Sequence, residues 1–234
     1  VAWESRPLAG HPFHVSPILA NFGGVDQVIM ISPYDRRDST KTHEVIAFDA
    51  QSGKELWKYT GLKSFATITP AMVIDDQRLF LTDCSFDGGY DPVSIMIEIS
   101  RKGEAFDVQE LFLTKEAGSK MHPAVLHENY LYLNHTGNPN QLQCLSLDGR
   151  VMWEKASAPG FELGALILVN GLIINQNGKN GDIYLIEPSP EGYKELGKAS
   201  FFNSKKSQAW VPLACSQGLL IVRDMEKMVC VDLQ

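Results

Sequence analysis

The sequence predicts an all-β protein, a β-propeller of four-stranded antiparallel blades, because three observations agree. Five segments, spaced 41 to 53 residues apart, begin with Pro or Gly and continue with apolar residues. Each of these segments is followed by further short runs of β type, and most of the later runs meet at a turn that contains Gly. No long stretch has the 3.6-residue period of a helix. Four short strands in a repeat of this length are typical of propeller blades.

The repeat units give the order of the expected strands. The units begin near Pro17, Pro70, Pro123, Gly164 and Pro212, with spacings of 53, 53, 41 and 48 residues. A Pro suits the start of an innermost strand, because its missing N–H falls outside the ladder. The second strands are expected at residues 28–31, 79–81, 131–133, 172–174 and 219–222. We therefore treat residues 1–234 as one propeller domain or propeller fragment with about five blades.

A third and a fourth strand are expected in most units, on either side of a tight turn. In VIAFDAQSGKELWKYTG the turn contains Gly53 and Trp57 follows four residues later, and Gly149 and Trp153 in LQCLSLDGRVMWEKA keep the same offset. The second and fourth units keep the turn glycine, Gly103 and Gly192, but lose the Trp. A large ring on an outer strand can cover the neighbouring blade, so we expect Trp57 and Trp153 to dock blades together.

Composition and charge restrict the classes of function. The chain is 44% hydrophobic and 21% charged, within the ordinary globular range. A net charge of -7 leaves no basic stripe for nucleic acid, and no segment has the roughly 18 consecutive apolar residues of a membrane span. The four cysteines form no C-x-x-C pair and no zinc spacing, so we expect them to be small buried residues: Cys84, Cys144, Cys215 and Cys230.

The stretch VIAFDAQSGKELWKYTG in the first unit resembles the repeat of the PQQ-like, or quinoprotein alcohol dehydrogenase-like, β-propeller family. Its units read roughly A-x-D-x-x-T-G-x-x-x-W, and Ala47, Asp49, Ser52, Gly53 and Trp57 match this pattern. The family includes quinone-dependent dehydrogenases, BamB-like scaffold proteins and unassigned exported bacterial propellers. The resemblance implies a bacterial protein that is periplasmic or otherwise exported. The resemblance assigns no catalytic residue to this chain, because the dehydrogenases have two adjacent cysteines and no two cysteines of this chain are adjacent. We therefore expect no cofactor, neither PQQ nor calcium.

The first residues of the chain resemble the outer strand of a blade. Val1-Ala2-Trp3 aligns with Glu55-Leu56-Trp57 on the repeat template, so Trp3 is a third candidate for docking blades together. Two explanations stay open. The N-terminal strand could complete the last blade of a closed five-bladed ring, or the chain could be part of a larger propeller, with eight blades by family resemblance.

The loops that enter the inner strands, and those that join second to third strands, meet on one face of a propeller. These loops are rich in polar, aromatic and Arg residues, which are typical of binding surfaces. The candidate binding residues are His14, Tyr34, Asp35, Arg37, Asp83, Asp87, His122, His135, Asn177, Trp210, Arg223 and Asp224.

Other roles for these loop residues stay open. They could simply be solvated, the three aspartates of DCSFDGGYDP could bind calcium, and the histidines could bind a metal or act as acids and bases. None of the spacings matches an established metal motif, and no nucleophile elbow, P-loop or Rossmann fingerprint occurs.

Two classes of function remain from the sequence. We expect a non-catalytic binding or scaffold module that engages a protein or a small polar ligand at the channel mouth. The alternative is a quinone-dependent oxidoreductase, or another enzyme, with a site in the central channel.

Overall fold

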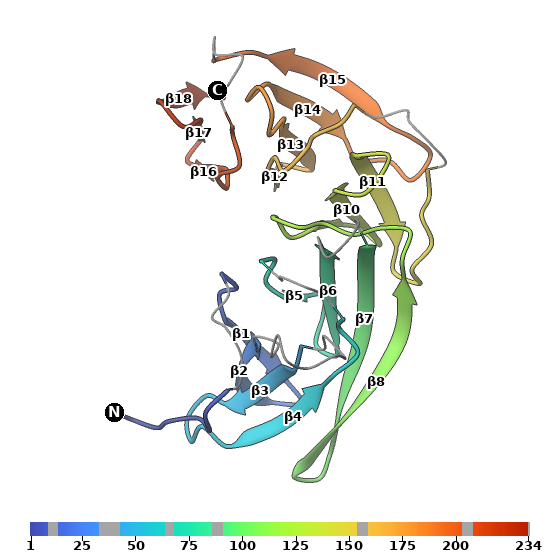
Figure 1. Ribbon diagram of the computed structural model, residues 1–234, viewed down its shortest axis with the longest axis vertical. Coiled ribbons are helices and arrows are strands. Elements are labelled where there is room, and N and C mark those ends of the chain that lie inside the picture. The colour runs from blue at the N-terminus through green and yellow to red at the C-terminus, as the bar shows by residue number, and fades with distance from the viewer. Residues whose placement is uncertain are drawn as a thin grey trace. The chain divides into compact units, whose positions relative to one another are not determined.

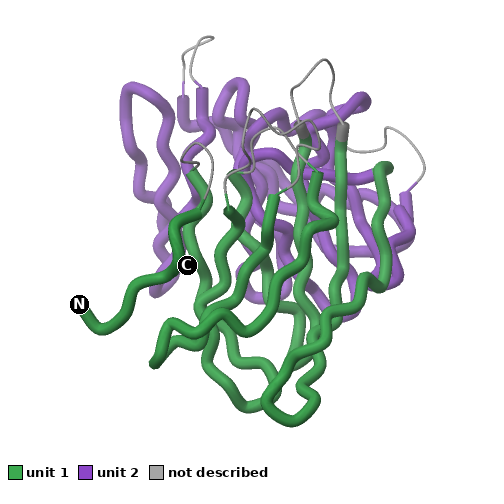
Figure 2. Tube along the Cα trace, turned by 60° about the horizontal axis from the view of Figure 1, so that its bottom comes forward, with its two compact units in different colours: residues 1–116 green, residues 117–234 purple. Residues whose placement is uncertain are grey.

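The computed structural model describes residues 1–8, 14–32, 43–63, 68–85, 91–153, 159–202 and 208–233. They form five antiparallel sheets and contain no helix, as the sequence predicted (Figure 1). None of the described segments is therefore a helix long and apolar enough to cross a bilayer. We call the sheets blades 1 to 5 in chain order. They fall into two compact units, unit 1 (residues 1–116) and unit 2 (residues 117–234), which are coloured separately in Figure 2.

Unit 1 contains two four-stranded blades. Blade 1 consists of β1 (Ile18–Phe22), β2 (Val25–Ile31), β3 (Val45–Asp49) and β4 (Glu55–Tyr59). Blade 2 consists of β5 (Met72–Val73), β6 (Arg78–Ser85), β7 (Asp91–Lys102) and β8 (Ala105–Thr114). In both blades each strand pairs with the next one along the chain, so the blades are simple meanders. The predicted turn at Gly103 joins β7 to β8, the long hairpin visible in Figure 1.

The described residues of unit 2 form three blades, and among them only blade 4 has four strands. Blade 3 consists of β9 (Val125–His127), β10 (Tyr130–His135) and β11 (Gln141–Ser146). Blade 4 consists of β12 (Leu166–Val169), β13 (Leu172–Gln176), β14 (Ile183–Glu187) and β15 (Lys194–Ala199). Blade 5 consists of β16 (Ala214–Ser216), β17 (Leu219–Arg223) and β18 (Met228–Asp232). After the turn of blade 3, the described residues up to Trp153 contribute the bridge between Val151 and Leu145.

The cores lie between adjacent blades. In unit 1, Trp57 on β4 is 5% exposed and packs in one cluster with Leu79, Ile95 and Ile97 of blade 2. Its Nε1–H donates to Oε1 of the buried Gln27 at 2.7 Å. In unit 2, a second cluster joins Trp153 and Tyr132 of blade 3 to the facing side chains of blade 4. A large ring that follows the turn after the third strand therefore fills the space against the next blade in both units.

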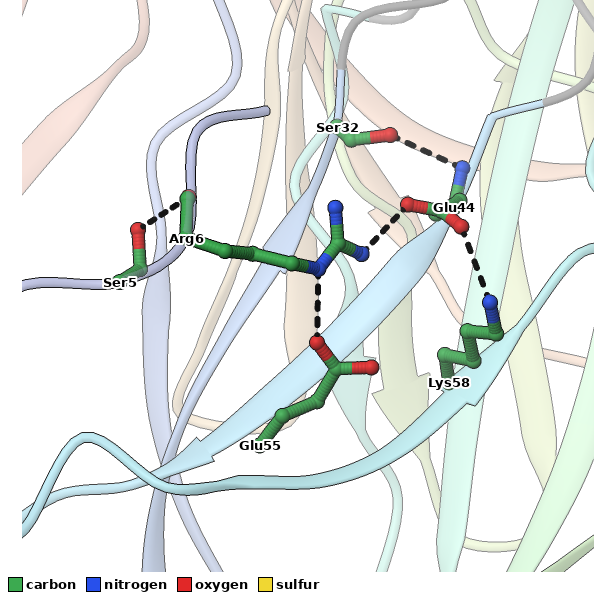
Figure 3. Close-up of polar contacts among 6 residues, drawn as sticks. All are labelled: Ser5, Arg6, Ser32, Glu44, Glu55 and Lys58. Carbon is green, nitrogen blue, oxygen red and sulfur yellow. Dashed lines mark hydrogen bonds and ion pairs between the residues drawn. The ribbon is translucent and has the colours of Figure 1, made fainter. Parts of the chain in front are cut away.

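The N-terminal residues pack onto blade 1. Nε1–H of Trp3 donates to the carbonyl of Ala50 at 3.1 Å, and its ring stacks on Phe48 at a centroid distance of 6.3 Å. Two residues of blade 1 hold Arg6, whose guanidinium lies 2.8 Å from Glu44 and 2.9 Å from Glu55 (Figure 3). These contacts tie the N-terminal segment to β3 and β4, the two outer strands of blade 1.

The cysteines divide by position. Cys84 and Cys144 are buried, as expected, and Cys215 is half-buried. Burial raises the pKa of the Cys144 thiol to about 11. The expectation of burial is wrong for Cys230, which is exposed on β18. Its neighbours Val229 and Val231 pack against the core cluster of blades 4 and 5, so Cys230 faces the other side of the sheet.

Candidate binding surface

The second strands of the blades in unit 2 all end in polar residues. Strand β10 ends in Asn134-His135, β13 ends in Asn175-Gln176, and β17 runs into Arg223-Asp224. All of these side chains except Arg223 are less than 9% exposed. Burying polar groups is costly unless they are hydrogen-bonded, so their partners determine what this end of unit 2 can do.

Blades 3 and 4 are joined here by a pair of buried amides. Nδ2 of Asn134 donates to Oδ1 of Asn175 at 2.8 Å, and Nδ2 of Asn175 donates back to Oδ1 of Asn134 at 2.7 Å. Asn134 also donates to the carbonyl of Gly164 at 2.8 Å. At Gly164 an added Cβ would lie 1.7 Å from the carbonyl oxygen of Gln176, so only glycine fits this approach. The pair holds the ends of β10 and β13 at a fixed separation.

Two buried histidines hold the loops that enter blades 3 and 5. His122 donates from Nε2 to the carbonyl of Trp210 at 3.0 Å, and Nδ1 of His135 accepts from the N–H of Gly118 at 3.1 Å. Burial lowers the pKa of both imidazoles below its ordinary value. Both rings are therefore neutral near pH 7 and act as hydrogen-bonding struts between loops.

Asn177 and Asp224 shape the turns that follow β13 and β17. Oδ1 of Asn177 accepts from the N–H groups of Lys179 and Asn180 at 2.9 and 3.2 Å. Asp224 is 2% exposed, and its Oδ1 accepts from two turn N–H groups, at 2.8 and 2.7 Å. Burial acts to raise the pKa of Asp224, but these backbone donors hold it below its usual value. The Oδ1 atoms of both side chains are occupied by their own loops, and Nδ2 of Asn177 donates to the carbonyl of Gly160 at 2.7 Å.

The exposed side chains at the same end are of another kind. Trp210 is 36% exposed and Met225 is 69% exposed, and Arg223 is also exposed. The loop that contains Trp210 and the loop that begins at Arg223 are both attached to the end of blade 4. The N–H of Ala209 donates to the carbonyl of Gly178 at 3.0 Å, and Nε2 of Gln176 donates to the carbonyl of Arg223 at 3.5 Å. We call Trp210, Arg223 and Met225, with the buried polar residues below them, the loop-end surface.

The structure assigns the candidate residues of unit 1 to different environments. His14 is exposed, whereas Asp83 is fully buried on β6 and its Oδ1 accepts from the N–H of Cys84 at 2.7 Å. Four candidates lie outside the described residues: Tyr34, Asp35, Arg37 and Asp87. Within the described ranges, no group of three or more His, Cys, Asp or Glu side chains could hold a metal ion.

Sequence reasoning missed residues of two kinds at this surface. Asn134 and Asn175 were not selected, although each stands near the end of a second strand, and this repetition was a readable signal. Met225 was not selected because a lone Met in a turn carries no pattern.

Comparison with solved structures supports the fold. The chain is similar to the periplasmic gluconolactonase PpgL of Pseudomonas aeruginosa, with a TM-score of 0.62 and 12% identity over 87% of this chain. It spans 64% of that protein's length. It is also similar to Chaetomium thermophilum Sqt1, bound to the N-terminus of ribosomal protein L10, with a TM-score of 0.50 and 8% identity over 89% of this chain and 68% of Sqt1.

No family model and no curated protein matches the sequence. At these identities the likeness to solved structures concerns the fold alone. Together with the five antiparallel sheets, it shows that the chain has a β-propeller fold with about five blades.

Proposed function

We propose that this chain is a non-catalytic binding module that engages a protein partner through the loop-end surface of unit 2. The observation that carries the proposal is the combination of exposed Trp210, Arg223 and Met225 with buried polar residues below them, of which Asn134, Asn175 and His122 are already hydrogen-bonded. Trp, Arg and Met are enriched in the central parts of protein interfaces. A surface that is rigid before binding loses little conformational entropy when a partner docks.

The occupied polar groups favour binding over catalysis. His122, His135 and Asp224 are the groups of this surface with acid–base chemistry, and each is engaged by the backbone of a loop. Each of these groups already uses a ring nitrogen or a carboxylate oxygen to hold the backbone of a loop, which supports a structural role. We further propose that the module works without PQQ or calcium.

The solved neighbours give the proposal limited support. Sqt1 was determined with the N-terminus of a ribosomal protein bound, so a protein of similar fold binds a peptide. The sequence is also compatible with a small polar ligand in place of a protein partner. Such a ligand would leave the exposed, largely apolar side chains of Trp210 and Met225 without a role.

The proposal is tested by photo-crosslinking in a native extract. A photoreactive phenylalanine analogue replaces Trp210 in one sample and Arg150 in the other. Arg150 is 74% exposed in the turn at the other end of blade 3 and is therefore a matched control for an exposed position. We expect a discrete protein adduct from position 210 and none from position 150.

Affinity for the identified partner then tests the individual residues. We expect Trp210→Ala and Arg223→Ala each to weaken binding by tenfold or more, as is usual for residues central to an interface, and Arg150→Ala to leave it unchanged. Equal adducts from both positions, or unchanged affinity in both loop-end variants, would show that the loop-end surface is not the binding surface.

A further inference from the structure

Blade 4 has a glycine where two other blades have an aromatic residue on the fourth strand. In blade 1, Trp57 pairs with Ala47 and a register shift follows at once. Blade 2 repeats this arrangement with Phe112 opposite Met96. In blade 4 the residue in the same place, opposite Leu185 and beside the same shift, is Gly197.

Within unit 2, Trp153 shows what an aromatic ring does at this place. It follows the turn of blade 3, is 6% exposed, and lies with its ring centroid 6.0 Å from that of Tyr132. Its Nε1–H donates at 3.0 Å to the carbonyl of Ser189, in the turn between β14 and β15 of blade 4. One indole thus fills the space between blade 3 and blade 4, and Gly197 offers no ring to the space between blade 4 and blade 5.

That space is an apolar groove of about 250 Å³ between blade 4 and blade 5. Its walls include Ile183, Leu185, Phe201, Leu220 and Val231. A Cβ built on Gly197 would meet no atom within 4 Å, and the backbone there is not in the left-handed region. The groove is therefore open at the point where the ring of Trp57 or Trp153 would begin.

The charge nearest the groove is already neutralised. Nζ of Lys198 lies 2.7 Å from Oδ2 of Asp182 and 4.9 Å from the centroid of the Tyr184 ring. Asp182 also accepts from the hydroxyl of Ser200 at 2.6 Å. The remaining lining is aliphatic or aromatic, so an ionised ligand would lose its hydration without gaining an unpaired counter-charge.

We infer that this groove binds a neutral, planar aromatic molecule of about the size of indole. Apolar cavities of about 150 Å³ already accept benzene, and drug-sized ligands need about 300 Å³ or more, so a groove of this volume suits one or two fused rings. The site lies between the blade faces and shares no residue with the loop-end surface, so it stands independently of the proposed function.

The test is a titration of the protein with 5-fluoroindole, followed by fluorine NMR of the ligand and by ¹H–¹⁵N NMR of the protein. We expect saturable binding with a Kd below about 1 mM, and amide shift changes on the protein confined to β15, β18 and their neighbours. Gly197→Trp places an indole in the groove and should weaken binding at least tenfold. Gly197→Ala, which adds only a methyl group, should stay within about threefold of the parent protein.

Several results would overturn the inference. One is the absence of saturable binding by the parent protein, which needs no variant to fold. Another is equal binding by Gly197→Trp when its circular dichroism matches that of the parent. If a second copy of the chain covers the groove, the parent protein will sediment as a dimer, Gly197→Trp will sediment as a monomer, and 5-fluoroindole will not bind.

Discussion

Replacing Trp57 with Ala should be among the most destabilising single changes in unit 1. A buried tryptophan removes about 150–250 Å² from water, which at about 25 cal/mol per Å² corresponds to about 4–6 kcal/mol. Measured truncations of large buried aromatics fall at about 3–5 kcal/mol, because the surroundings partly relax. Trp57 is 5% exposed between blades 1 and 2, so we expect the free energy of unfolding to fall by about 4 kcal/mol.

A second variant separates the ring from its hydrogen bond. Trp57→Phe keeps most of the apolar area but removes the N–H that donates to Gln27, whose side chain is fully buried. Leaving that oxygen unpaired costs about 1–3 kcal/mol, so the Phe variant should lose about 2 kcal/mol. The assay is urea unfolding at 25 °C, followed by both fluorescence and near-UV circular dichroism, with the midpoint and the slope reported separately.

Trp210→Ala is the matched control, because this Trp is 36% exposed. We expect it to lower the free energy of unfolding by clearly less than Trp57→Ala does, because about a third of the Trp210 surface is already in contact with water. If Trp57→Ala costs less than about 1 kcal/mol at an unchanged slope, the ring does not hold blade 2 against blade 1 and the reasoning from burial fails. The same conclusion follows if the two Trp→Ala variants are equally destabilised.

Two further predictions concern thiols and pH. At pH 8 iodoacetamide should alkylate Cys230 about a hundredfold faster than Cys144, because Cys144 is buried and its pKa is raised to about 11. In 6 M guanidinium the two thiols should react at the same rate. Equal rates in the folded protein would contradict the burial of Cys144. Because burial lowers the folded-state pKa of His122 and His135, the unfolded chain binds protons more readily below about pH 6.5. The contribution of the two neutral imidazoles to the free energy of unfolding is therefore complete above that pH. It is lost as the pH falls, by up to about 1.4 kcal/mol per pH unit for each histidine. Urea unfolding between pH 7.5 and 5.5 should show this loss, and the double variant His122→Gln, His135→Gln should show a smaller one; an identical pH dependence in the variant would exclude the two imidazoles as its source.

The fold was largely readable because propeller strands are short and their turns are marked by Gly or Pro. The units expected at Pro17, Pro70, Pro123, Gly164 and Pro212 begin within two residues of the innermost strands observed. Alternation and turn chemistry are local properties, so the sequence states them directly. In blade 3 the described residues after the turn form a bridge rather than the expected fourth strand, because pairing depends on contacts that no local pattern contains.

The candidate surface was less readable, because the sequence does not say whether a polar side chain faces solvent or its own loop. Asp83 and Asp224 carry the same carboxylate as any exposed acid, yet both are buried and accept backbone hydrogen bonds. Arg223, the neighbour of Asp224, is exposed. Asp224 follows the end of β17, so no strand alternation indicates which way its side chain points, and for Asp83 on β6 the assignment of sides requires the partner blade.

The groove at Gly197 shows why a lost motif is hard to interpret from sequence. The second and fourth units both lack the Trp of the repeat, and the sequence treats them as equally degenerate. The register distinguishes them, because Phe112 replaces the ring in blade 2 whereas Gly197 leaves the place without a side chain. Counting from the turn glycine fails, since the equivalent residue follows Gly53 by four positions, Gly192 by five and Gly103 by nine. A hairpin of variable length moves the motif along the sequence, but the bulge on the fourth strand keeps it at one place in the blade.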